Sequence, residues 1–376
     1  MGPLKGIKCI EVGGVGPGPF CGMMLSDMGA EIIRVERKGH RPPLKPRHDV
    51  MFRGRRAIIG IDLKKREGVE AVLDFVSRSD VLFEGFRPGV MEKMGLGPDV
   101  CLERNPGLVY GRMTGWGQDG PLAHAAGHDI NFIALVGALN AIGRPGEKPI
   151  PPINLLGDVA GGGMSLAFGI VCALLEAKKS GKGQVVDAAI VDGAAMLMAT
   201  TCGLQAAGFW GERGTNLLDG GAHFYDTYET ADGKYISIGS VEPKFYALLL
   251  EKTGITGPEF KAKMDRKRWP ALKDDIAKVF KTKTRDEWCE IMEGTDVCFA
   301  PVLSLEEAMN HPHNVARQVF FESDGVKQPA PAPRFSRTKP EHHGVPPILC
   351  EDIESVLAEC GFSGDEIQAL KKAEVI

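Results

Sequence analysis

The sequence has no excess of positive charge and no paired cysteine motif. Lys and Arg number 45 against 49 Asp and Glu, which gives a net charge of −4. A chain with this balance lacks the basic footprint of a nucleic-acid-binding protein. The 9 cysteines are odd in number and none forms a C-x-x-C pair. We therefore predict reduced thiols, no disulfide framework and no zinc site.

Targeting and membrane signals are also scarce. The N-terminus "MGPLKGIKCIEV" lacks a cationic start followed by an apolar core, so no secretory signal is predicted. No run in the sequence is judged long and apolar enough to cross a bilayer. The last residues, "AEVI", do not form an S-K-L type peroxisomal signal. We expect a cytoplasmic protein that does not insert into membranes, with mitochondrion and peroxisome left open.

Strands and helices alternate through the first half of the chain. Residues 7–12 and "AEIIRVER" are predicted strands on either side of a helix at about 20–28. Further strands are predicted at 80–86, in "GLVYGRMTGWG" and in "QVVDAAI", with helices at 66–78 and 159–178. This alternation predicts an α/β fold with a mostly parallel sheet. A length of 376 residues suggests a second domain.

The pattern changes near residue 211. "HFYDTYETADGKYISIGS" predicts a hairpin turning at Asp232-Gly233, and helices are expected at about 243–253, 271–280 and 285–293. The C-terminus predicts two amphipathic helices broken at Gly361. The predicted domains are a large α/β domain and a small α+β domain, joined by linkers. Their ranges are 1–200 with 329–376 for the large domain, 221–318 for the small domain, and 201–220 with 319–340 for the linkers.

A Gly- and Pro-rich loop, "EVGGVGPGP", follows the first strand. It invites comparison with a dinucleotide-binding turn, but residue 19 is Pro where the last Gly of G-x-G-x-x-G would stand. Pro17 and Pro19 also remove two backbone donors that a pyrophosphate would need, which argues against an NAD-dependent dehydrogenase. Basic residues cluster near strand ends and would suit an adenosine with extra phosphates, although each alone could be a solvated charge. They are Arg34, Arg37, Lys38, Arg53, Arg55, Arg56, Lys64, Arg87 and Lys93.

Several long motifs occur together in order: "GPGPFCGMMLSDMGAEIIRVER", "TGWGQDGP", "GHDINF", "GDVAGGG", "GKGQVVDAAIVDG", "GSVEPKFY" and "PAPRFSRT". Over essentially the whole chain they resemble the family III CoA-transferases (CaiB/BaiF), and in particular the branch that racemises 2-methylacyl-CoA thioesters. The resemblance implies that the large domain is a Rossmann-like CoA-binding domain and that the protein is an interlocked homodimer. It places the active site between one subunit's large domain and the other's small domain. It also implies an acyl-CoA substrate that brings its own CoA, so no separate cofactor and no metal are expected.

The resemblance assigns roles to individual residues. His128 and Asp158 are the expected catalytic acid and base, and Glu242 is expected to orient His128. Asp129 and Asn154 are expected beside Asp158. Contacts with the CoA nucleotide are predicted at Arg37, Arg55, Lys64, Arg87 and Lys93.

Racemisation needs two bases, because the α-proton leaves one face of the thioester and another proton returns on the opposite face. Imidazole and a partly buried carboxylate suit these roles near neutral pH. We expect the backbone N–H of Asp158 to stabilise the enolate oxygen at a helix N-terminus, and Gly161–Gly163 to admit the thioester. Branched fatty acyl or sterol side-chain tails are expected to lie near Met164, Met196 and Met198, unless these only fill the core.

Purely structural roles for the same residues stay open. Asp158 alone could be a helix cap, His128 a hydrogen-bonded core residue, and Glu242 a first-turn acid before Pro243. Two further functions are considered: a CoA-transferase with Asp158 as nucleophile, and a non-catalytic acyl-CoA carrier. The histidine of "GHDIN" argues against the first. A carrier has no need of a matched acid and base.

Overall fold

The structure of the protein is a computed structural model that describes residues 2–39, 48–344 and 352–376. The chain divides into two compact units. The large unit comprises Met1–Val136, Ile153–Leu197 and Gln318–Ile376, and the small unit comprises Gly137–Pro152 and Met198–Arg317. The predicted large domain, 1–200, included residues 137–152. They join the small unit because Arg144 bonds to Asp226 and Arg213 donates to the carbonyl of Asn140.

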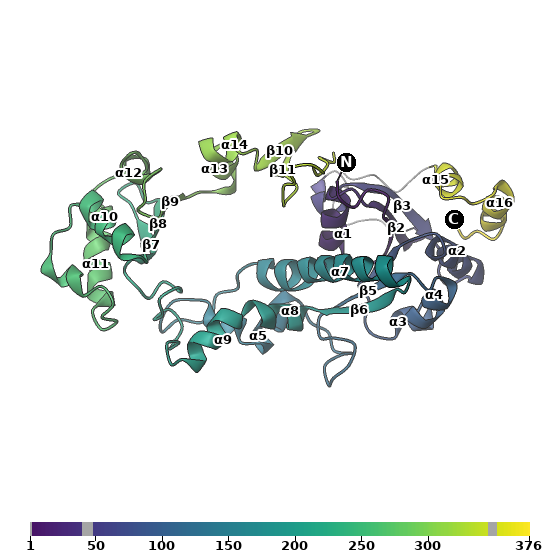
Figure 1. The fold of residues 1–376 in the computed structure, drawn as a ribbon, viewed down its shortest axis with the longest axis horizontal. Coiled ribbons are helices and arrows are strands. Elements are labelled where there is room, and N and C mark those ends of the chain that lie inside the picture. Colours follow the sequence, from purple (N-terminus) through teal and green to yellow (C-terminus); the bar gives the residue numbers. More distant parts are fainter. Residues whose placement is uncertain (1, 40–47, 345–351) are drawn as a thin grey trace. The chain divides into compact units, whose positions relative to one another are not determined.

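A six-stranded sheet forms the centre of the large unit, and every neighbouring pair of its strands is parallel (Figure 1). The strand order is β3-β2-β1-β4-β5-β6. The order reverses between β1 and β4, and ligands of such sheets bind beyond the carboxyl ends of the strands at this switch point. The strands are β1 Lys8–Val12, β2 Glu31–Arg37, β3 Arg55–Ile61, β4 Val81–Glu84, β5 Val109–Thr114 and β6 Gln184–Ala189.

The predicted α/β fold with a parallel sheet is confirmed, but it holds one strand that sequence analysis did not identify. Strand β3 contains the sequence "RRAIIGI", which we had considered only for its arginines. Arg55 at its start is buried, and burial alternates along the strand as expected at a sheet edge. The basic residues at its start therefore mark a strand rather than a loop.

Helices cover both faces of this sheet (Figure 1). Helices α1 (Pro17–Asp27) and α7 (Ser165–Ser180) bury Cys21, Leu25 and Ile170 in the core on one face. The core on the other face includes side chains of α2 (Arg66–Val76), α4 (Pro98–Arg104), α15 (Ile353–Glu359) and α16 (Gly364–Lys372). The remaining helical segments are η2 Val50–Phe52, α3 Val90–Lys93, α5 Asp129–Leu135, η3 Leu155–Met164 and α8 Ile190–Leu197.

The small unit is built around the predicted hairpin. Strands β7 (Tyr225–Glu229) and β8 (Tyr235–Gly239) are antiparallel, and β9 (Phe299–Val302) pairs with β8. The turn at Asp232-Gly233 is confirmed by the positive φ of Gly233, which a glycine adopts without strain. The helices are α6 Ala138–Ala141, α9 Ala199–Ala206, α10 Pro243–Thr253, η4 Pro258–Ala262, α11 Trp269–Phe280, α12 Arg285–Met292, α13 Leu305–Asn310 and α14 Pro312–Ala316.

The expected linker at 319–340 holds a second hairpin. Strands β10 (Phe320–Ser323) and β11 (Val326–Pro329) are antiparallel and belong to the large unit. The Arg53 guanidinium donates to the carbonyl of Pro329 at 2.7 Å and to the side chain of Gln328 at 2.9 Å. These bonds tie the returning chain to the start of β3.

The π-helix η3 runs directly into α7, so Leu155–Ser180 is one helical stretch of 26 residues. Its length and composition would suffice to cross a membrane, and our expectation that no run is that apolar is wrong. Buried core helices pass the same test. This one packs against α1, β5 and β6, and it carries Asp158 in its first turn.

Candidate active site

A cavity of about 270 Å³ lies at the carboxyl edge of the large sheet, beside the switch point. The loops that follow β1, β4 and β5 form its walls, and Ile190 after β6 completes them. This is the place where doubly wound sheets bind ligands. The residues around it include Gly16, Pro17, Phe86, Arg87, Pro88, Thr114, Trp116, His128, Phe132 and Asp158.

His128 caps the N-terminus of α5 from an extended backbone conformation. Its backbone N–H donates to the side-chain oxygen of Asn131 at 3.0 Å, and its side chain is exposed at the cavity. Gly127 before it is required, because a Cβ there would lie 2.7 Å from Phe132 and 2.9 Å from Trp116. The two rings pack edge to face with centroids 4.7 Å apart. The aromatic pair thus fixes the backbone just before His128.

Asp158 lies in the first turn of the π-helix η3, and π-helical turns are rare and often found at functional sites. The Asn154 amide lies 3.5 Å from its Oδ2. Burial raises the pKa of the Asp158 carboxyl, the Asn154 amide lowers it, the Asp129 charge raises it and the His128 charge lowers it. Asp158 therefore holds a proton more readily than an exposed aspartate does, as a residue alternating between acid and base requires.

The structure brings four of the predicted site residues together around the cavity. Asp129 and Asn154 both touch Asp158, and His128 faces the same cavity. Gly16, in the loop after β1, also belongs here: a Cβ at this position would lie 3.4 Å from Asp158 Oδ2. From the sequence we had considered this loop only as a dinucleotide-binding turn, which Pro17 and Pro19 argue against. The left-handed backbone of Gly16 was the signal that could not be seen in the sequence.

The expected role of the Asp158 backbone is wrong. Its N–H donates to Asp129 Oδ2 at 2.7 Å and is not available to an enolate oxygen. The helix also begins earlier than predicted, with Asn154 as its N-cap. The carboxylate that occupies this N–H is 29 residues away in sequence, which is why the pattern did not reveal the bond.

The glycines after Asp158 also serve packing rather than substrate access. A Cβ on Gly161 would lie 2.8 Å from the Ala194 backbone nitrogen in α8. Those on Gly162 and Gly163 would lie 2.9 Å from the Pro17 ring and 2.8 Å from its carbonyl. The three glycines let α1 and α8 approach the π-helix closely.

The predicted CoA-binding residues separate into two groups. Arg87 lines the cavity, and Arg37, Lys64 and Lys93 are exposed on or after the elements near the carboxyl edge. Arg55 is buried instead. Its guanidinium donates to Glu11 at 2.9 Å and to the carbonyls of Met51 and Pro19 at 2.7 Å each. The prediction that Arg55 binds CoA is therefore withdrawn.

Glu242 belongs to the small unit, where it caps α10 without a side-chain bond to the helix. The loop before it is held by Lys263, whose Nζ donates to the carbonyls of Ser240 at 2.8 Å and Val241 at 2.6 Å. Burial lowers the pKa of Lys263, and the negative charge of Glu242 opposes that shift. The pairing of Glu242 with His128 stays a prediction.

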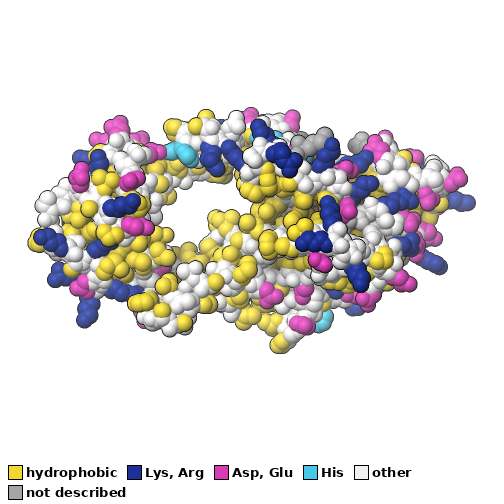
Figure 2. Space-filling model, viewed as in Figure 1, with side chains coloured by type: hydrophobic (Ala, Val, Ile, Leu, Met, Phe, Trp, Pro, Cys, Tyr) yellow, Lys and Arg dark blue, Asp and Glu magenta, His cyan; other side chains and the backbone are white. Residues whose placement is uncertain are grey.

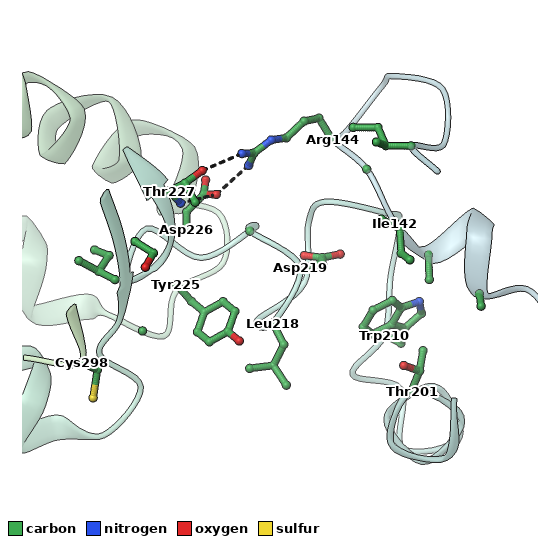
Figure 3. Close-up of a pocket in the computed structure, with 18 of the residues that line it drawn as sticks. Ile142, Arg144, Thr201, Trp210, Leu218, Asp219, Tyr225, Asp226, Thr227 and Cys298 are labelled. Carbon is green, nitrogen blue, oxygen red and sulfur yellow. Dashed lines mark hydrogen bonds and ion pairs between the residues drawn. The ribbon is translucent and has the colours of Figure 1, made fainter. Parts of the chain in front are cut away.

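A second cavity, of about 760 Å³, lies within the small unit (Figure 3). Trp210, Leu218 and Tyr225 are among its walls, and Arg144 bonds to Asp226 and Thr227 beside it. It is larger than the first cavity but presents no matched acid and base. Within the described residues no group of three or more His, Cys, Asp or Glu could hold a metal ion. The smaller cavity is the better candidate because it holds both His128 and Asp158.

The doubly wound sheet, the cavity at its switch point and the "GHDIN" and "GDVAGGG" segments define one class of protein. The chain belongs to CoA-transferase family III, whose family model matches residues 4–353.

Individual relatives narrow the comparison. The chain is 45% identical to the mouse α-methylacyl-CoA racemase and 44% identical to the human one, in each case over 99% of this chain and 97% of the relative. A crystal structure of a CaiB/BaiF family protein from Brucella suis has a TM-score of 0.82 and 26% identity, covering 96% of this chain and 99% of that one.

Proposed function

We propose that the protein racemises 2-methylacyl-CoA thioesters by moving a proton between two bases, His128 and Asp158. The observation that carries this proposal is their presence at one cavity, beside the switch point of the sheet. The identity of 44–45% to two α-methylacyl-CoA racemases, over nearly the full chain, supports the same reaction.

In the proposed reaction one base removes the proton from Cα, and the electron pair of that C–H bond forms an enolate with the thioester carbonyl. The other base, already protonated, then donates its proton to the opposite face of Cα. The raised pKa of Asp158 lets it hold a proton more readily than an ordinary aspartate does, as the donating partner of this exchange must. Only protons move, so the step calls for no redox cofactor, and CoA enters as part of the substrate.

We propose that Arg87 contacts the CoA moiety, with Arg37, Lys64 and Lys93 as further candidates. Arg87 is the one among these that lines the cavity. Its guanidinium suits phosphate oxygens. Branched fatty acyl and sterol side-chain thioesters are the proposed substrates.

We also propose a homodimer. Met164, Phe168, Val171 and Leu175 recur at helical spacing along one side of the η3–α7 helix, and each is exposed, Phe168 to 73%. Hydrophobic side chains gather over part of α7 in the space-filling view (Figure 2). An exposed apolar stripe of this kind marks an interaction surface, and a second copy of the chain would cover it.

The test is proton NMR of a single epimer of a 2-methylacyl-CoA incubated with the protein in D₂O. Deuterium at Cα together with the opposite epimer is expected for the wild type. His128→Gln and Asp158→Asn should each lose at least about 100-fold in rate while still binding the thioester. Near-wild-type turnover by either variant would remove the two-base mechanism.

A CoA-transferase is the second candidate, because the family contains transferases by name. In that reaction the Asp158 carboxylate would attack the thioester carbonyl, form an acyl anhydride and release CoA as a thiolate. Transfer of CoA to an added carboxylate, without deuterium at Cα, would favour it. Hydroxylamine would then trap the anhydride on Asp158.

A further inference from the structure

A row of charged side chains crosses three adjacent strands below the cavity. Glu84 on β4 is paired in register with Arg112 on β5, which is paired with Asp187 on β6. Neighbours in register point to the same face of a sheet, so the three side chains share one face. Arg112 Nε lies 3.4 Å from Glu84 Oε1, and its Nη1 lies 2.8 Å from Glu92 Oε1 on α3.

Glu84 is 1% exposed, and burying a carboxylate is costly unless it is paired and hydrogen-bonded. Its Oε2 accepts a bond from the Phe86 backbone N–H at 2.7 Å, whereas its Oε1 has no hydrogen-bond donor among the described residues. Phe86 belongs to residues 85–88, which line the cavity and include Arg87. We call residues 85–88 the switch loop. The carboxylate of Glu84 thus accepts a bond from the backbone of a loop that forms a wall of the cavity.

The switch loop rests in turn on the loop after β1. A Cβ on Gly13 would lie 2.4 Å from the Phe86 ring, and one on Gly14 would lie 3.4 Å from the Gly85 Cα. The same β1 loop carries Gly16, which faces Asp158. A shift of the switch loop would therefore disturb both the Arg87 side and the Asp158 side of the cavity.

We propose that Glu84 is a positioning residue that holds the switch loop, and with it Arg87, in the arrangement that binds the CoA moiety of the substrate. The proposal rests on the proposed acyl-CoA function of this cavity. Glu84 is not among the residues that line the cavity. It acts through the backbone N–H of Phe86 and is itself oriented by Arg112.

The ionisation of Glu84 should make the strength of its bond with Phe86 depend on pH. Burial raises the pKa of the Glu84 carboxyl to about 7, against the Phe86 N–H and Arg112, which lower it. Glu92 on α3 raises it further, while Tyr110 lies close enough on β5 for Glu84 to raise its pKa. Asp187 on β6 lies on the other side of Arg112. A hydrogen bond to an ionised acceptor is stronger than one to a neutral acceptor, so the switch loop should be held more firmly as pH rises through 7.

The experiment compares wild type, Glu84→Gln and the control Glu92→Gln, which removes the other acidic partner of Arg112. Calorimetry measures the Kd of 3′-dephospho-CoA from about pH 6 to about pH 8, because this probe lacks the phosphate that titrates in that window. Racemase assays give KM and kcat. We expect Glu84→Gln to raise both Kd and KM about tenfold at pH 8, with little change in kcat. Binding by wild type and Glu92→Gln should strengthen with pH, and binding by Glu84→Gln should not.

Equal Kd values and equal pH profiles for wild type and Glu84→Gln would overturn the inference and leave the proposed function standing. A wild type that neither binds CoA nor racemises the thioester would overturn both. If Glu84→Gln fails to fold, the wild type still decides, because a Kd for 3′-dephospho-CoA that is constant across the pH range is incompatible with the proposal.

Discussion

Replacing Asp129 should destabilise the protein and reduce its activity by different routes. Asp129 is 7% exposed, and its Oδ2 accepts the Asp158 backbone N–H at 2.7 Å. Asp129→Ala removes the acceptor and leaves that N–H without a partner, at a cost of about 1–3 kcal/mol. Asp129→Asn keeps an oxygen in the same place, so we expect it to lose about 1 kcal/mol or less.

The same change alters the chemistry of Asp158. Burial is the main reason that the Asp158 pKa is raised, and the Asp129 charge adds to that effect. Removing a negative charge favours the ionised neighbour, so the Asp158 pKa should fall in both variants while staying raised by burial. The acid limb of the pH–rate profile should therefore move to lower pH. Because Asp129→Ala also frees the π-helical turn, its kcat should fall about 10- to 100-fold, and that of Asp129→Asn should fall less.

Urea unfolding followed by far-UV circular dichroism measures the stability difference, and initial rates across pH measure the shift. Asn131→Ala is a matched control, since it removes the side-chain acceptor of the His128 N–H at the same helix terminus but leaves the Asp158 bond intact. If Asp129→Ala unfolds at the same urea concentration as the wild type, the bond to Asp158 contributes nothing. An unchanged pH profile in Asp129→Asn would refute the electrostatic argument separately.

Two further predictions concern Lys263 and Glu84. Lys263→Met keeps an apolar stem but deletes the donors to the carbonyls of Ser240 and Val241, which hold the loop before Glu242. If Glu242 orients His128 as proposed, kcat should fall about tenfold. Lys263→Arg should restore part of the rate, and wild-type rates for Lys263→Met would contradict this. Glu84 has a folded-state pKa of about 7 against an ordinary 4.5, so the folded state holds its proton more tightly than the unfolded state does. Its contribution to stability is thus fully present below about pH 4.5 and is lost by up to about 3 kcal/mol as pH rises through 7. Urea titrations should show this decline in the wild type and its absence in Glu84→Gln.

The sequence was most informative where a local pattern decides the structure. The hairpin at Asp232-Gly233 and the helix at 243–253 were predicted closely, because a turn dipeptide or an amphipathic period is visible within a few residues. The pairing of distant elements was not visible. Nothing near Asp158 in the sequence indicates that Asp129 occupies its N–H, or that Gly16 stands against its carboxylate.

The glycines after Asp158 show a related limit. A run of three glycines beside a candidate catalytic residue has two physical explanations, close approach of a ligand or close approach of another helix. We expected the approach of a ligand, although the sequence alone does not decide between the two. The distances from Gly161 to α8 and from Gly163 to α1 decide for helix packing.

The strand positions of the arginines contain enough information to separate the buried, paired ones from the exposed ones. Arg34 lies in the middle of a strand that was already predicted, and a charge inside a buried strand needs a partner on the same face. Glu11 on the adjacent strand is that partner, in register with Arg34 and also bonded to Arg55. Arg34 further donates to the carbonyls of Gly13 and Gly14 at 2.8 Å each, so it shapes the loop at the cavity from below.

Position relative to the strand end therefore separates two kinds of basic residue. Arg34 and Arg55 lie within strands or at a strand's start, are buried and hold the sheet and its loops together. Arg37 ends its strand and Arg87 follows another, and both are exposed at the edge where parallel sheets bind ligands. A cluster of arginines in an α/β sequence is evidence for phosphate binding only after the members inside strands are set aside, because those are already needed to neutralise buried carboxylates.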